Sequence, residues 1–142
     1  MSHYVAYSDG SYCGNNASAF AVLIINAHTN EEVLFSAGII PAKDSRKAEL
    51  HAIQVAVKNI PNGSNVTFFT DQKNFVDLIM SDKCHKKDYT KKIKTLCGNK
   101  QLNYDFQYAK AHCPEFPNLI KVDHLARKTC KRHDRREKAK VS

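Results

Sequence analysis

The sequence predicts an α/β fold in which a five-stranded mixed sheet carries helices packed on its faces. Five short runs rich in Val, Ile and aromatic residues are typical of strands, and apolar residues at helical spacing separate the later runs. No repeat or linker divides the 142 residues. A chain of this length buries roughly 68–70% of its unfolded surface, so we expect one domain over residues 1–142.

The first three strands are expected to form an antiparallel meander. Residues 4–8, 18–26 and 32–40 have the composition of strands. The sequences Cys13-Gly14-Asn15-Asn16 and His28-Thr29-Asn30 favour the turns between them, because small and amide side chains tolerate left-handed backbone. Since short turns join antiparallel neighbours, these strands should lie side by side.

Helices and two further strands make up the rest of the chain. Ser45 is expected to cap a helix that runs to about Asn59, and residues 61–64 end it. Residues 66–70 then form a short strand, and the helical crossover that joins it to the preceding strand implies parallel pairing. Weak helical periodicity follows at 74–80 and 89–97, and a fifth strand at 104–110. The last helix should begin near Asn118 and enter a basic tail from about residue 128, which we expect to fray beyond Arg132.

Positive charge is unevenly distributed. The net charge is +8, and residues 1–40 contribute no Lys or Arg to it. The basic residues gather in two stretches, Lys83, Lys86, Lys87, Lys91, Lys92 and Lys94, and Arg127, Lys128, Lys131, Arg132, Arg135, Arg136, Lys138 and Lys140. Each stretch is compatible with a solvated helix face or with a polyanionic partner, and the acidic residues described below favour the polyanion.

The cysteines predict reduced thiols. The sequence has five of them, an odd number, and no C-x-x-C pair, which argues against a disulfide framework. Two zinc-ligand sets can be imagined, but neither has the spacing of a known zinc finger. These sets are Cys84, His85 and Cys97, and His112, Cys113, Cys130 and His133.

Neither a membrane span nor a secretory signal is recognisable. The longest apolar run is far shorter than the roughly 20 residues that cross a bilayer. The first four residues lack the basic segment that opens a signal peptide. We therefore expect a cytoplasmic protein without a membrane partner, and a monomer by default.

Four acidic residues lie where strands end or helices begin. Asp9 follows the first strand, Asp71 ends the fourth, and Glu49 and Asp123 lie early in the first and last helices. Each could alone be a turn or helix cap. In an α/β sheet, however, such ends converge at one rim. Two carboxylates about 4 Å apart repel by roughly 4 kcal/mol at an effective dielectric of about 20, so a cluster of four predicts divalent cations such as Mg²⁺.

The segments around these acids resemble the four signature segments of type 1 ribonuclease H, in the same order. They are Tyr7-Ser8-Asp9-Gly10-Ser11, Ala48-Glu49-Leu50, Phe69-Thr70-Asp71 and Val122-Asp123-His124-Leu125-Ala126-Arg127. The resemblance covers nearly the whole chain and implies a ribonuclease H-like fold. It also implies hydrolysis of the RNA strand of RNA–DNA hybrids with two Mg²⁺ or Mn²⁺ ions, held by Asp9, Glu49, Asp71 and Asp123.

The resemblance implies further site residues. His112 would assist proton transfer or product departure. The hybrid would contact six other residues, namely Gly10, Ser11, Asn16, Ser45, Gln72 and Asn118. The chain departs from the family in reading Asp44-Ser45-Arg46 where an amide-rich segment is usual. It also lacks Trp and the long basic handle of some members, so the lysines of 83–94 and the basic tail are expected to contact phosphates instead.

Two other functions fit the same residues. One is a DNA-directed nuclease built on the same sheet, which would cleave duplex DNA as well as hybrid. The other is a non-catalytic module that binds hybrid or double-stranded RNA. Four mutually repelling acids argue against a module without metal chemistry.

Overall fold

The computed structural model of the chain describes residues 2–81, 88–110 and 113–141. Its elements follow the predicted order, which confirms the α/β fold class and the mixed sheet. They are β1 (His3–Gly14), β2 (Ala17–Asn26), β3 (Glu32–Ile40), α1 (Ser45–Asn59), β4 (Asn65–Thr70), α2 (Lys73–Ile79), α3 (Asp88–Asn99), β5 (Asn103–Tyr108) and α4 (Pro117–Val141).

The sheet has the strand order β3-β2-β1-β4-β5. β1, β2 and β3 form the predicted antiparallel meander. β4 pairs in parallel with β1, and β5 in parallel with β4. The parallel pairing of β4 was therefore correctly predicted, but its partner is β1 rather than the preceding strand β3. The meander leaves the far side of β1 open, and the α1 crossover carries the chain back to it.

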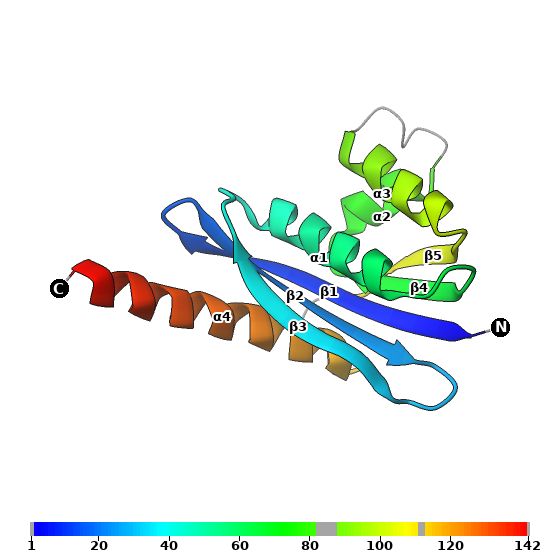
Figure 1. Cartoon of the computed structure of the whole chain (residues 1–142), viewed down its shortest axis with the longest axis horizontal. Coiled ribbons are helices and arrows are strands. Elements are labelled where there is room, and N and C mark those ends of the chain that lie inside the picture. The colour runs from blue at the N-terminus through cyan, green and yellow to red at the C-terminus, as the bar shows by residue number, and fades with distance from the viewer. Residues whose placement is uncertain (1, 82–87, 111–112, 142) are drawn as a thin grey trace.

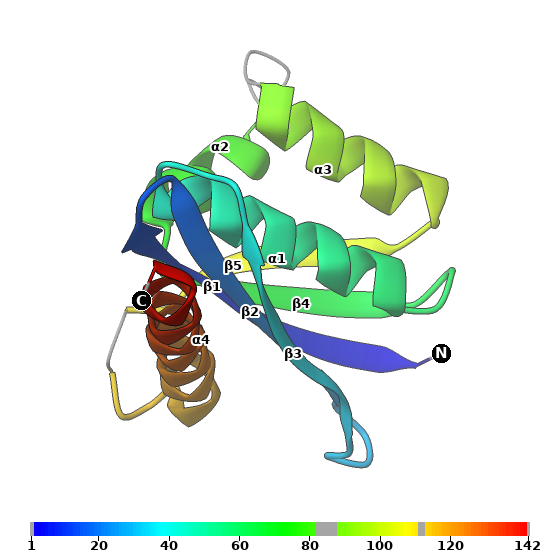
Figure 2. The ribbon, with the colours of Figure 1, turned by 60° about the vertical axis from the view of Figure 1, so that its left-hand side comes forward.

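Helices cover both faces of the sheet. Figures 1 and 2 show α1, α2 and α3 over one face and α4 alone beneath the other. Along β1, Tyr4 and Ala6 join the core below α1, whereas Tyr7 joins the smaller core against α4. Because successive strand residues point to opposite faces, neighbouring residues of β1 reach different helices. This alternation places the side chains of the site described below.

The N-terminus of α1 is capped by Asp44. Its carboxylate accepts a hydrogen bond from the backbone nitrogen of Lys47 at 3.0 Å, and its own backbone is extended. The prediction of Ser45 as the cap was wrong, because Ser45 is already the first helical residue. Both types can cap a helix, and the backbone conformation decides between adjacent candidates. Ser18 fixes the entry by donating its hydroxyl to the carbonyl oxygen of Ala42 at 3.0 Å.

A disulfide joins Cys13 at the end of β1 to Cys130 in α4, with the two Cα atoms 5.1 Å apart. The expectation of reduced thiols was therefore wrong for this pair, whereas Cys97 and Cys113 are free. The zinc set that included Cys130 is excluded by the same bond. Sequence spacing could not reveal the pair, because the fold brings together two positions that are 117 residues apart.

The α4 helix continues unbroken to Val141. The expected fraying beyond Arg132 is contradicted, since Lys, Arg, Glu and Ala are strong helix formers even on an exposed surface. Lys140 and Glu137, three residues apart, form an ion pair at 3.4 Å near the end. Throughout the described ranges, each helix is too short or too polar to span a bilayer.

Candidate active site

The predicted acidic site lies where β1 continues past its neighbour β4. The last paired position is Tyr7 with Phe69, and β4 ends at Thr70. Asp9 therefore follows the part of β1 that pairs with β4, and Asp71 comes directly after β4. The open side of β1 at this point leaves room for groups from both strands and from α1.

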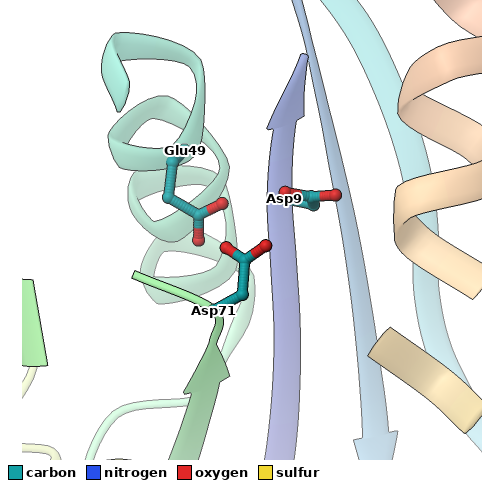
Figure 3. Close-up of side chains that lie close together, drawn as sticks. All are labelled: Asp9, Glu49 and Asp71. Carbon is teal, nitrogen blue, oxygen red and sulfur yellow. The ribbon is translucent and has the colours of Figure 1, made fainter. Parts of the chain in front are cut away.

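Three carboxylates meet at this opening. One oxygen each of Asp9, Glu49 and Asp71 lies within 4.8 Å of the others (Figure 3). Asp9 and Glu49 are only 6% and 3% exposed, and Asp71 is partly buried. The predicted convergence is confirmed for these three residues, which we call the three-carboxylate cluster.

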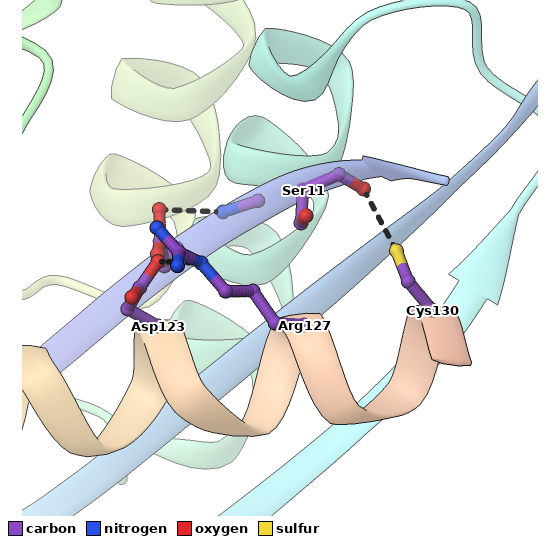
Figure 4. Close-up of polar contacts among 6 residues, drawn as sticks. Ser11, Asp123, Arg127 and Cys130 are labelled. Atoms are coloured by element: carbon purple, nitrogen blue, oxygen red, sulfur yellow. Dashed lines mark hydrogen bonds and ion pairs between the residues drawn. The ribbon is translucent and has the colours of Figure 1, made fainter. Parts of the chain in front are cut away.

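The fourth predicted acid, Asp123, lies on the α4 side of Asp9. A side-chain hydrogen bond with Asp123 contributes to raising the pKa of Asp9. The Nε of Arg127 lies 3.3 Å from Asp123 Oδ1 (Figure 4). Asp123 is not among the carboxylates that meet within 4.8 Å in the described part of the chain. The structure thus places Asp123 at the border of the cluster, where the positive charge of Arg127, one helical turn away, balances its negative charge.

Two buried hydroxyls orient Glu49. Ser8 Oγ and Thr70 Oγ1 both donate to Glu49 Oε1, at 2.6 and 2.9 Å. The other oxygen, Oε2, is buried, and no hydrogen-bond partner reaches it from the described residues. Sequence reasoning missed Ser8 and Thr70. Their signal is that each is polar at an inward-facing strand position and immediately precedes an acid.

The electrostatics of the cluster favour protons or cations. Burial raises the pKa of Asp9 above its ordinary value, and the charges of Glu49 and Asp71 raise it further. Burial also raises the pKa of Glu49, although the Ser8 hydrogen bond opposes this shift. Buried like charges cannot all ionise without compensation. The unpartnered Glu49 oxygen and two crowded aspartates are a donor set suited to a hard divalent cation.

Gln72, predicted as a substrate contact, also supports an acid. Its side-chain Nε2 donates to Asp71 Oδ1 at 3.1 Å, and its backbone nitrogen donates to Thr70 Oγ1 at 3.2 Å. Asp71 is therefore held by its immediate neighbour rather than by a distant element.

Gly10 and Ser45, two other predicted contacts, meet each other where α1 crosses β1. A Cβ at Gly10 would collide with the carbonyl oxygen of Ser45 and lie 2.7 Å from the backbone nitrogen of Glu49. Glycine at this position thus lets α1 approach closely enough for Glu49 to reach the cluster.

The remaining predicted contacts surround the site more loosely. Ser11 lies in β1 beyond the acids, with its carbonyl oxygen 3.5 Å from Cys130 Sγ (Figure 4). Asn16 is exposed in the β1–β2 turn with a positive φ of 61°, as the amide-rich sequence predicted. Asn118 is half-buried in the first turn of α4. His112 lies outside the described residues.

A cleft of about 360 Å³ opens between the starts of α1 and α2. Glu49 and Gln72 form part of its lining, and Arg46 and Lys47 bring positive charge to it. The cleft thus brings two basic side chains next to Glu49 of the acidic cluster.

Comparison with solved structures assigns the fold. The N-terminal RNase H domain of a Mycobacterium tuberculosis protein matches with a TM-score of 0.74 and 11% identity, over 96% of this chain and 99% of that one. RNase H1 from Halobacterium salinarum matches with a TM-score of 0.72 and 12% identity, over 91% of this chain and 98% of that one. An RNase H1 isolated from compost, solved in complex with an RNA/DNA hybrid, matches with a TM-score of 0.69 and 16% identity, over 92% of this chain and 98% of that one. The chain therefore has the fold of RNase H1 domains.

Sequence comparison identifies the family. The profile of the RNase H family matches residues 1–131, and the chain belongs to that family. Its type 1 signature segments agree with the RNase H1 domains among its structural neighbours. A search of curated protein sequences found no match.

Proposed function

We propose that this protein hydrolyses phosphodiester bonds in the RNA strand of RNA–DNA hybrids with the help of two divalent cations. The observation that carries the proposal is the three-carboxylate cluster, positioned at the open side of β1 within an RNase H fold. The relative solved with an RNA/DNA hybrid supports hybrid as the substrate.

Asp9, Glu49 and Asp71 would hold the cations, with Asp123 completing the set. Support comes from the buried Glu49 oxygen without a partner and from the raised pKa of Asp9, which a bound cation would lower. Mg²⁺ suits these oxygen ligands, and Mn²⁺ can occupy the same type of site. Bound there, such cations would supply an activated water and would stabilise the leaving oxygen of the phosphodiester.

The residues around the acids keep their oxygens in place. Ser8 and Thr70 occupy one oxygen of Glu49 and leave the other, which is buried, without a hydrogen-bond partner among the described residues. Gln72 holds Asp71 in a similar way, by donating to its Oδ1. Because the carboxylate oxygens are fixed before substrate arrives, little reorganisation is needed when cations and phosphate bind. Arg46 and Lys47 in the adjoining cleft supply positive charge for backbone phosphates.

The test compares four labelled substrates, RNA–DNA hybrid, single-stranded RNA, RNA duplex and DNA duplex, in Mg²⁺ and in Mn²⁺. We expect selective cleavage of hybrid, reduced at least a hundredfold by Asp71→Asn and unchanged by Asp77→Asn, which removes an exposed acid of α2 outside the cluster. Calorimetric titration of Mg²⁺ provides a second readout, with binding lost only in Asp71→Asn.

Other outcomes would select another function. Equal cleavage of DNA duplex and hybrid would indicate a DNA-directed nuclease. Hybrid binding without cleavage in either metal would indicate a non-catalytic module.

A further inference from the structure

The C-terminal half of α4 carries most of the chain's net charge. Residues 127–141 contain eight basic and two acidic residues, so six of the eight net positive charges lie there. The RNase H family match ends at residue 131, whereas α4 continues to Val141. Half of this net charge, three of the six, therefore lies on residues 132–141, beyond the part of the chain that matches the family.

One row of cations on α4 is aligned with the acidic site. Arg127, Lys131, Arg135 and Lys138 follow one another at intervals of four, four and three residues, so they share one face of the helix. All four are exposed. Asp123 lies one turn before Arg127 on this face and contacts it at 3.3 Å. We call these four residues the α4 stripe. Asp134 borders the stripe and lowers the net charge of this face without reversing it.

A second row faces the opposite way. Arg132, Arg136 and Lys140 line a groove of about 590 Å³ between α4 and the edge strand β3. Glu137 lies in the same groove, and so does the ring of Phe35. We call Arg132, Arg136 and Lys140 the groove row. The body of α4 separates this row from the acids, which makes the two rows physically distinguishable on one helix.

The length of the α4 stripe suits a nucleic-acid backbone. The 15 residues from Asp123 to Lys138 span about 22 Å at 1.5 Å per residue. Phosphates of one strand are spaced by about 3.4 Å along a duplex axis, so the stripe could follow roughly six of them. A duplex bound at the three-carboxylate cluster and running along α4 would remain in contact with the basic side chains of the stripe over this distance.

We propose that the α4 stripe binds the phosphate backbone of the hybrid on one side of the cleavage site. This inference rests on the proposed function and identifies where the duplex leaves the site. It places on α4 the phosphate contacts expected of the basic tail in a chain without the long basic handle. The groove row then contributes only general attraction.

The experiment uses two matched triple variants in the full chain. The stripe variant is Lys131→Ala, Arg135→Ala and Lys138→Ala, and the control is Arg132→Ala, Arg136→Ala and Lys140→Ala. Each removes three charges from the same helix, and alanine preserves helix propensity. Arg127 is kept because it contacts Asp123. Circular dichroism is used to check that both variants retain their helical content.

Hybrid binding is measured by fluorescence anisotropy from 50 to 300 mM KCl, with Asp71→Asn present in every protein to prevent cleavage. We expect the stripe variant to lose about 2–3 units of the log–log salt slope, since each phosphate contact contributes roughly 0.7–0.9. Its Kd should rise at least tenfold at low salt. The control should lose less than one unit.

The duplex length gives a second, independent readout. Hybrids are shortened from either end around a fixed cleavage site, and the penalty of the stripe variant should disappear when one arm, and not the other, falls below about four base pairs. Equal losses in the two triple variants, a larger loss in the control, or a penalty independent of arm length would each overturn the proposal. If neither variant lost affinity or salt slope, the proposal would be overturned as well, and an acidic protein would become the expected partner of the basic end of α4.

Failure of the proposed function has a different signature. If the chain with intact acids cleaves no hybrid while the stripe variant still loses salt slope, the catalytic proposal fails and the binding surface stands. If hybrid is cleaved and the stripe variant leaves both KM and salt slope unchanged, the stripe proposal fails alone.

Discussion

Asp9 lies where a charged carboxylate is least stable in the metal-free protein. Its pKa is raised by burial first and by Glu49 and Asp71 next. Because the folded pKa lies above the ordinary value of 3.8, the folded state binds the proton more tightly than the unfolded state. The free energy of unfolding in EDTA should therefore fall as the pH rises above about 4.

Asp9→Asn removes this titration. In EDTA at neutral pH we expect the variant to melt at a higher temperature than the parent. Its free energy of unfolding should also decrease less steeply between pH 5 and pH 8. Asp77→Asn, at an exposed position in α2, controls for the loss of one negative charge. Identical pH slopes in the parent and Asp9→Asn, measured by calorimetry, would contradict this account.

Gly10 allows the close approach of β1 and α1. In Gly10→Ala the added methyl would meet backbone atoms of Ser45 and Glu49, which cannot rotate away as a side chain would. We expect a loss of about 1–3 kcal/mol in the free energy of unfolding, typical of overpacking. Gly98→Ala in α3 is the control, since nothing lies within 4 Å of its Cβ, and it should gain about 0.5–1 kcal/mol. Urea unfolding of both variants measures the difference.

The acids of the site could be predicted from the sequence, but their supporting groups could not. Asp9 and Asp71 follow strand-like runs, and strand ends meet at one rim. The hydrogen bonds of Ser8 and Thr70 to Glu49 depend on the register of β1 and β4 and on the distance of α1. Those are tertiary quantities that no local pattern contains.

At the scale of elements, the N-cap of α1 shows how much one residue stabilises the end of a helix. Asp44→Ala removes the hydrogen bond to the Lys47 backbone nitrogen, and we expect a loss of about 1 kcal/mol. Ser45→Ala should cost little by comparison, because its side chain does not form the cap. If chemical denaturation gave the larger loss for Ser45→Ala, the assignment of the cap would be reversed.

The disulfide between β1 and α4 should contribute more than any cap. It closes a loop of 117 residues, and loop-closure entropy predicts about 4–5 kcal/mol for loops of this size. Cys130→Ser, or addition of dithiothreitol to the parent, should lower the free energy of unfolding by several kcal/mol. Cys113→Ser removes a free thiol and should leave both the stability and its response to dithiothreitol unchanged.

Element types were easier to predict than their partners. The β-branched runs and helical periodicities located every strand and helix to within a few residues, apart from β1, which continues to Gly14. That extension was hidden because Asp9, Gly10 and Ser11 are poor strand formers in isolation. They pair with β2, in which Ala21, Phe20 and Ala19 lie opposite them in that order. Tertiary pairing thus overrides local preference at the site itself.

For the whole molecule, cation binding should act on global stability. The three carboxylates come from β1, α1 and the end of β4, so a cation that binds only the folded state stabilises all of these elements together. A Mg²⁺ concentration a hundredfold above Kd should add about 2.7 kcal/mol. Thermal melts in MgCl₂ and in NaCl of equal ionic strength give the comparison. Asp71→Asn should lose most of the Mg²⁺ effect, and a shift of equal size in that variant would exclude the cluster as the binding site.

The Cys13–Cys130 bond also determines how the chain would respond to mechanical force. If both termini were pulled, only the residues before Cys13 and after Cys130 could extend, about 24 residues or roughly 80 Å, compared with roughly 480 Å for the reduced chain. Glu49, Asp71 and Asp123 lie inside the covalent loop and would bear no load. Asp9 lies outside it, on the segment of β1 that would be peeled away. Tension on the oxidised protein would therefore remove Asp9 from the cluster while leaving the other acids in place.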